Sequence, residues 1–249
     1  MLIFKGFIEK LGISLFFIIF FYHYAKSFIY SISYSLAIWF GIAKHYPLEV
    51  AKGSVELPLM VCFHLLFCAL CIYLFSVPIK SALSFSYHSI FPLIVLGVLL
   101  GVGLMGFSSL LCRAVIECLR SMDSSFPQDV SQWLIMVRSG WVRHYFHTLD
   151  VLPFYIALLI VCAQVCCEEL MFRGVWIHYF SSGPMVSIIM STCLFMGMQV
   201  FHMPSRLSVI FPLVGSMVIG LVHGILYSCV PSLIPLMVSH ATFFLVAVL

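Results

Sequence analysis

Hydrophobic residues occupy most of the chain in long runs, and short polar stretches separate these runs. Residues 11–24 and 28–43 form two neighbouring apolar runs, which predict either one long tilted helix or two shorter membrane segments. The later apolar runs cover residues 57–77, 91–112, 151–180, 185–202, 207–229 and 231–249. A helix that crosses a bilayer needs about 20 apolar residues. The pattern therefore predicts an all-α, polytopic transmembrane helical bundle with about 7–8 membrane helices.

Two polar stretches interrupt the first half of the chain. Residues 44–56 contain four charged residues, one proline and one glycine, and this composition predicts a loop. Residues 113–150 hold eight charged residues, and apolar and aromatic positions recur among them at helical spacing from Val130 to Tyr145. Because indole rings and arginines favour the headgroup layer, this stretch predicts an interfacial helix. An amphipathic helix packed on protein is the alternative.

The composition agrees with a membrane protein. Hydrophobic residues make up 63% of the chain and charged residues only 8%, whereas about a quarter of the residues of a soluble domain are charged. The net charge of +3 is small and scattered, which argues against nucleic acid as a partner. Most of the ten cysteines lie in apolar runs, so they are predicted to be buried thiols. Membrane lipids are the expected surroundings.

Charged residues are rare after residue 150, and most of them are neighbours. Three of the four between residues 151 and 249 are Glu168, Glu169 and Arg173. A charged side chain inside a bilayer costs about 2.5–3.5 kcal/mol on insertion scales, so this cluster needs a reason. Residues four apart share a helix face, and Glu169 is therefore predicted to pair with Arg173.

Glu168 is turned about 100° away from Glu169 on a helix and lacks that pairing. Burial and a neighbouring negative charge both favour the protonated carboxyl group, which suits a residue that takes a proton from water. We predict that Glu168 is a general base and that Glu169 and Arg173 form its structural brace. A purely structural ion-pair cluster that joins two helices is the alternative.

Three of the histidines further along the apolar half of the chain are His202, His223 and His240. Histidine inside a membrane span usually faces a polar cavity. Two histidines and a carboxylate from three helices could bind zinc, and the candidate ligands are Glu168, His202 and His240. The same side chains could instead hold a water molecule and stabilise an oxyanion without a metal. The sequence leaves the cofactor open.

Two segments resemble a known family of membrane proteases. Residues 167–174 read CEELMFRG and resemble the EExxxR motif of the CPBP family, the CAAX-protease, bacteriocin-processing and Abi-type intramembrane proteases. Residues 220–227 and 232–241 resemble the later motifs of this family, in the same order. The resemblance covers about residues 150–249. It divides one continuous membrane domain into N-terminal helices at 1–150 and protease-like catalytic helices at 151–249.

The resemblance implies an intramembrane endopeptidase that hydrolyses a peptide bond of a membrane-associated protein or peptide, including lipidated ones. It implies that Glu168, with His202 and His240, activates water, and that Glu169 and Arg173 complete the site. Whether the enzyme is a metalloprotease or depends on glutamate alone stays open. We expect a multi-pass protein of a bacterial cell membrane.

Two positions depart from the motifs of this family. The residue four before His202 is Met198 where the family has phenylalanine, and Phe195 is out of register. The residue four after His240 is Phe244, where the family has asparagine or aspartate. Phenylalanine cannot donate a hydrogen bond to an oxyanion.

These departures leave several functions open. Either His223 or Gln199 takes over the missing role, or the activity is weak or lost. One alternative is a non-catalytic family member that acts as a membrane binding or immunity protein. A second is a proton- or ion-coupled transporter, against which the absence of a visible inverted repeat weighs.

Overall fold

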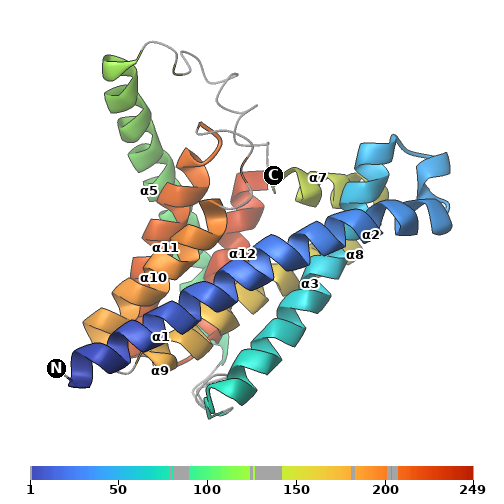
Figure 1. Ribbon diagram of the computed structural model, residues 1–249. Coiled ribbons are helices and arrows are strands. Elements are labelled where there is room, and N and C mark those ends of the chain that lie inside the picture. The colour runs from blue at the N-terminus through green and yellow to red at the C-terminus, as the bar shows by residue number, and fades with distance from the viewer. Residues whose placement is uncertain are drawn as a thin grey trace.

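The described part of the molecule is a bundle of helices (Figure 1). The computed structural model describes residues 2–78, 80, 90–123, 126, 142–180, 183–200, 203 and 207–248. Among these residues, five helices are long and apolar enough to cross a membrane, and two shorter apolar helices accompany them. The predicted all-α membrane bundle is thereby confirmed, and the chain is an integral membrane protein.

The described elements follow one another along the chain and are all helical. They are α1 (Leu2–Ile19), a π-helical segment (Phe20–Ala25), α2 (Lys26–Trp39), a short 3-10 turn (Ile42–Lys44), α3 (Leu48–Leu74), α5 (Ile90–Met122), α7 (Val142–Val151), α8 (Phe154–Glu169), a second π-helical segment (Leu170–Trp176), α9 (Ile177–Tyr179), α10 (Pro184–Val200), α11 (Ile210–Cys229) and α12 (Ile234–Val248).

The two apolar runs near the N-terminus form one continuous helical rod. α1 passes through the first π-helical segment into α2 without a break, and the rod lies across the bundle in Figure 1. This decides between the one long helix and the two short segments that the sequence allowed. The rod ends at Gly41, whose positive φ of 72° a glycine adopts without strain.

The predicted loop at residues 44–56 is wrong from Leu48 onward, because α3 begins there. Pro47 lies directly before the first turn, and proline is well tolerated where a helix begins. Lys52 and Glu56 lie one turn apart, with Nζ and Oε1 separated by 3.6 Å. This pairing lets both charges remain in a buried helix face.

Two glycines bring α5 and α12 close together. A Cβ atom added to Gly97 would lie 2.7 Å from Cβ of Val238, and one added to Gly101 would collide with the backbone oxygen of Ser239. Small residues four positions apart allow this close approach of two helices. This contact holds α12 against α5 at Ser239, the residue before His240.

α5 is longer than its predicted apolar run, because it continues to Met122 through an exposed set of ion pairs. Arg113 and Arg120 both lie within 4 Å of Glu117 on this last part of the helix. Residues 127–141, which hold most of the predicted interfacial helix, lie outside the described residues. The chain is described again from α7, which packs on α3.

The predicted helix over residues 151–180 begins later than the pattern indicated. Pro153 separates α7 from α8, and the residue before a proline disfavours helical geometry. From Phe154 the backbone stays helical to Tyr179, but it widens into the second π-helical segment directly after Glu169. The continuous helical path therefore places both glutamates immediately before the π-helical segment.

Candidate functional site

The two glutamates lie at the C-terminal end of α8, deep inside the bundle. Only 4% of the Glu168 surface is exposed, and Glu169 is fully buried. The π-helical segment that follows leaves the carbonyl of Phe172 to accept a hydrogen bond from the Ser191 hydroxyl on α10. Single π-helical turns often occur at functional sites, where they redirect the side chains around them.

One oxygen of Glu169 contacts three basic side chains. Its Oε1 lies 3.1 Å from Nη1 of Arg173, 2.7 Å from Nδ1 of His240 and 3.2 Å from Nδ1 of His223. All four side chains are buried, so a full carboxylate is balanced by positive charge in low dielectric. Glu169 therefore joins α8 to α11 and α12 through the site.

The contact with Glu169 sets the orientation of the His240 ring. Because Nδ1 faces a carboxylate at 2.7 Å, it carries the proton and donates it, which leaves Nε2 with a lone pair. Nε2 lies 3.8 Å from Oε2 of Glu168. This separation exceeds a direct hydrogen bond, and it is the kind of gap that a shared water molecule bridges.

Glu168 is held from the other side by a chain of buried polar groups. Nε2 of Gln164 donates to Oε1 of Glu168 at 3.1 Å and to Nδ1 of His64 at 3.1 Å. His64 then donates through Nε2 to the Tyr22 hydroxyl oxygen, 2.8 Å away. The chain links α8 to α3 and to the first π-helical segment, and it fixes one oxygen of Glu168.

Sequence reasoning missed this chain of polar groups. Its signal was present, because His64 lies in the middle of an apolar run and Gln164 lies one helical turn before Glu168. A polar side chain inside a span needs a partner, and Gln164 at this spacing shares a helix face with Glu168. The contact between Gln164 and His64, 100 residues apart in the chain, has no such local signal.

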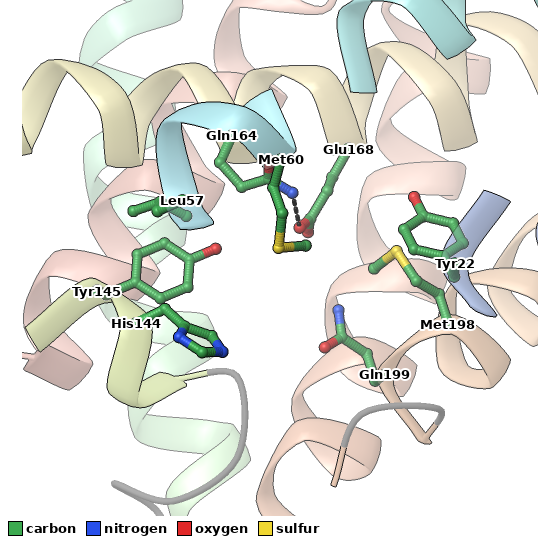
Figure 2. A pocket seen from close by; sticks show the side chains of 9 residues that line it. All are labelled: Tyr22, Leu57, Met60, His144, Tyr145, Gln164, Glu168, Met198 and Gln199. Carbon is green, nitrogen blue, oxygen red and sulfur yellow. Dashed lines mark hydrogen bonds between the residues drawn. The ribbon is translucent and has the colours of Figure 1, made fainter. Parts of the chain in front are cut away.

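Glu168 points into a small cavity between the helices, with a volume of about 30 Å³ (Figure 2). Its lining is mainly apolar and aromatic with a few polar groups, as in many small-molecule and peptide sites. The lining residues are Tyr22, Leu57, Met60, His144, Tyr145, Gln164, Glu168, Met198 and Gln199. Several of these precede residue 150, so the first half of the chain forms much of the cavity wall.

The remaining sequence-predicted positions are placed as follows. His202 lies outside the described residues, and in the sequence it comes two positions after Val200, the last residue of α10. Gln199 lines the cavity, whereas His223 is fully buried behind it and contacts Glu169 and the Ser239 hydroxyl. Of the two residues considered as replacements for a lost hydrogen-bond donor, Gln199 is therefore the one that reaches the cavity.

Phe244, which departs from the motif, and the out-of-register Phe195 both pack against residues around the site. The ring of Phe244 packs on the ring of Tyr145, with centroids 4.2 Å apart. Phe195 covers two residues of the site, because the Arg173 guanidinium lies 4.8 Å from its ring centroid and the His240 ring lies 5.8 Å away, edge to face. Phe195 therefore contributes to the site from its own register, as a packing surface for the charged groups.

No group of three His, Cys, Asp or Glu side chains among the described residues is arranged to hold a metal ion. Glu168 and His240, two of the predicted zinc ligands, do lie close together. The third, His202, belongs to the part of the chain that is not described. A buried imidazole whose Nδ1–H meets a carboxylate suits a metal ligand as well as a metal-free role.

Comparison with known proteins identifies the part of the chain that carries these groups. Residues 150–246 match the family model described as type II CAAX prenyl endopeptidase Rce1-like. Comparisons with curated proteins and with solved structures found no match. The match confirms the resemblance drawn from the EExxxR motif and the later histidine motif, and the family is one of CAAX-type intramembrane proteases. Residues 150–246, which contain both glutamates, Arg173 and His240, are therefore the part of the chain that is similar to the Rce1-like family.

Proposed function

We propose that this protein is an intramembrane endopeptidase in which Glu168 is the general base. The observation that carries the proposal is the gap of 3.8 Å between Oε2 of Glu168 and Nε2 of His240, where Glu168 lines the cavity. A water molecule in this gap donates one hydrogen to Glu168 and one to His240. Both acceptors hold it in place for attack on a peptide carbonyl in the cavity.

The hydrolysis then proceeds in two proton transfers. Glu168 removes a proton from water while the water oxygen bonds to the carbonyl carbon, and the carbonyl oxygen becomes an oxyanion. The C–N bond then breaks, and the proton held by Glu168 moves to the leaving amine nitrogen. Glu169 touches no reacting atom in this scheme. It is a positioning residue, because it keeps the proton of His240 on Nδ1.

The oxyanion needs a hydrogen-bond donor that Phe244 cannot supply. Gln199 is our candidate, since its side chain lines the same cavity as Glu168. His202 is proposed to assist from the segment after α10, as the family motif implies. Replacing His202 by alanine is expected to lower turnover without lowering the melting temperature of the protein, because a residue that serves only the reaction leaves packing intact.

The family description suggests the class of substrate. Type II CAAX prenyl endopeptidases act on prenylated CAAX sequences, and we propose a lipidated peptide with this C-terminal motif as the substrate. The apolar cavity wall at Leu57, Met60 and Met198 suits the aliphatic side chains of such a sequence. Membrane lipid is the medium from which the lipidated substrate arrives.

The decisive test is cleavage of a quenched fluorescent peptide that ends in a farnesylated CAAX sequence, with the purified protein in lipid vesicles. We expect cleavage by the wild-type protein and a loss of at least about a hundredfold in Glu168→Ala. Mass spectrometry of the products identifies the bond that is cut. The matched control is Glu117→Ala, which removes an exposed glutamate on α5 and should retain full activity.

Three results would contradict this assignment. Full activity of Glu168→Ala would exclude it as the base. One zinc ion per chain in the wild-type protein that is lost in Glu168→Ala, measured by elemental analysis, would make this residue a metal ligand instead. A folded wild-type protein that cleaves no peptide would favour the alternative function, a non-catalytic membrane binding protein. Phe244, which stands where the family has a polar residue, is consistent with that alternative.

A further inference from the structure

A second buried pair of a glutamate and a histidine lies outside the matched family segment, between α3 and α7. Oε2 of Glu56 lies 2.7 Å from Nδ1 of His144, the same separation as between Glu169 and His240. Both side chains are at least nine-tenths buried. The hydrolysis described above uses neither residue, so their charge needs another reason.

His144 lines the same cavity as Glu168. Figure 2 shows the two side chains on opposite sides of this cavity. Nδ1 of His144 is the ring nitrogen that faces Glu56, so Nε2 lies on the other edge of the ring, the edge available to a ligand in the cavity. The Glu56 carboxylate holds the ring in this orientation, and a hydrogen on Nε2 makes that nitrogen a donor toward an anionic ligand in the cavity.

The surroundings of Glu56 are basic. Lys52 lies 3.6 Å from its Oε1, and Lys26 on α2 is near enough to interact with it electrostatically. Two lysines and one histidine therefore share a single carboxylate among these described residues. Because Glu56 can balance only one of the two lysine charges, the cluster favours an additional anionic group. His144 is its member that reaches the cavity.

We propose that His144, held by Glu56, binds the C-terminal carboxylate of the peptide whose scissile bond lies against Glu168. The inference rests on the proposed function, in which the substrate is a peptide with a CAAX sequence at its C-terminus. Leu57 and Met60 lie in the cavity wall and provide apolar surface for the aliphatic residues of that sequence. The contact at His144 thereby determines which peptide bond, counted from the C-terminus of the substrate, lies against Glu168.

The test compares two farnesylated CAAX peptides that differ only at the C-terminus, one a free acid and the other an amide. Binding is measured by fluorescence anisotropy on the Glu168→Ala protein in lipid vesicles, so that cleavage cannot interfere. We expect the acid to bind about tenfold to a hundredfold more tightly than the amide. In Glu168→Ala/His144→Gln the two peptides should bind equally, with the affinity that the amide already shows.

A matched control distinguishes recognition from a merely structural role. His147, three residues along α7, is half-buried and does not line the cavity. Glu168→Ala/His147→Gln should keep the preference for the acid. His144→Arg in the Glu168→Ala background retains a cation at the position and is expected to keep part of the preference, which His144→Gln loses.

Several outcomes would overturn the inference while leaving the proposed function intact. Equal binding of acid and amide by Glu168→Ala would do so without any His144 variant. A preference that survives in His144→Gln, or a loss of affinity for both peptides alike, would also contradict it. So would a His144-dependent preference for phosphatidylserine over phosphatidylcholine vesicles without any difference between the peptides, since the cluster would then bind a lipid headgroup.

Discussion

At the residue scale, the site divides the work of its two adjacent glutamates by what each one contacts. Glu169 is surrounded by Arg173, His223 and His240, whereas Glu168 contacts the amide of Gln164 and faces the cavity. The difference follows from helix geometry, because neighbouring residues on a helix point into different sectors. Glu169, whose charge is balanced by its basic neighbours, is suited to orienting the His240 ring. Glu168, which lines the cavity, is suited to proton transfer.

This division predicts a specific result for Glu169→Gln. The amide retains the size of the side chain but removes the charge that balances Arg173 and holds the proton of His240 on Nδ1. Turnover should fall by about a hundredfold or more. The protein should also lose about 3–5 kcal/mol of stability, because a buried cation is left without its partner.

Two measurements check this prediction, namely the rate of peptide cleavage and the melting temperature in detergent. The Glu168→Gln variant is the comparison, since it should lose activity but retain far more stability because its partner is the neutral Gln164 amide. Equal melting temperatures of the Glu169→Gln and wild-type proteins would show that Glu169 does not brace the site.

At the element scale, the sequence predicted what depends on local spacing and missed what depends on contacts between distant segments. The pairing of Glu169 with Arg173 and the approach of α5 through Gly97 and Gly101 are both encoded by residues four apart. The beginning of α3 was missed because charged residues were read as loop. Lys52 and Glu56 compensate each other inside the helix, and composition alone does not reveal such a pair.

The close contact of α5 with α12 leads to a prediction for Gly101→Ala. An added methyl group would meet the backbone at Ser239 and the side chain of Thr242, neither of which can yield easily. We expect a loss of about 1–3 kcal/mol of stability from overpacking. Activity should fall as well, because α12 carries His240 and its displacement widens the gap to Glu168.

Gly103→Ala is the matched control for this variant. It lies on the same helix two residues away, with open space where its methyl group would be. Its melting temperature and cleavage rate should stay at or slightly above the wild-type values, because alanine favours a helix more than glycine does. Similar behaviour of the two variants would contradict the role assigned to the α5 contact with α12.

At the scale of the whole molecule, the two halves of the chain contribute different parts of one site. The matched segment supplies Glu168, Glu169 and His240, whereas the helices before it supply the polar chain through His64 and the basic cluster around Glu56. None of these contacts between the halves could be predicted from the sequence, since each joins residues dozens of positions apart.

The bundle as a membrane protein makes a prediction about its cysteines. Four cysteines are exposed on the surface of the described protein, namely Cys229 at the end of α11 and the three thiols Cys62, Cys118 and Cys193. Cys62 and Cys193 lie within the apolar helices α3 and α10, where lipid should cover them, but Cys118 lies among Arg113, Glu117 and Arg120 at the end of α5. Charged side chains at this density belong outside the hydrocarbon core.

A polar, membrane-impermeant maleimide should therefore modify Cys118 in vesicles in which this end of α5 faces outward, and it should leave Cys62 and Cys193 unmodified. Peptide mapping by mass spectrometry reads out each site. After transfer to denaturant all three thiols should react. This result would show that lipid, and not a low reactivity of the thiols themselves, had protected Cys62 and Cys193. Modification of Cys62 or Cys193 at the rate of Cys118 in intact vesicles would mean that α3 or α10 faces water, and the membrane orientation of the bundle would have to be redrawn around the cavity.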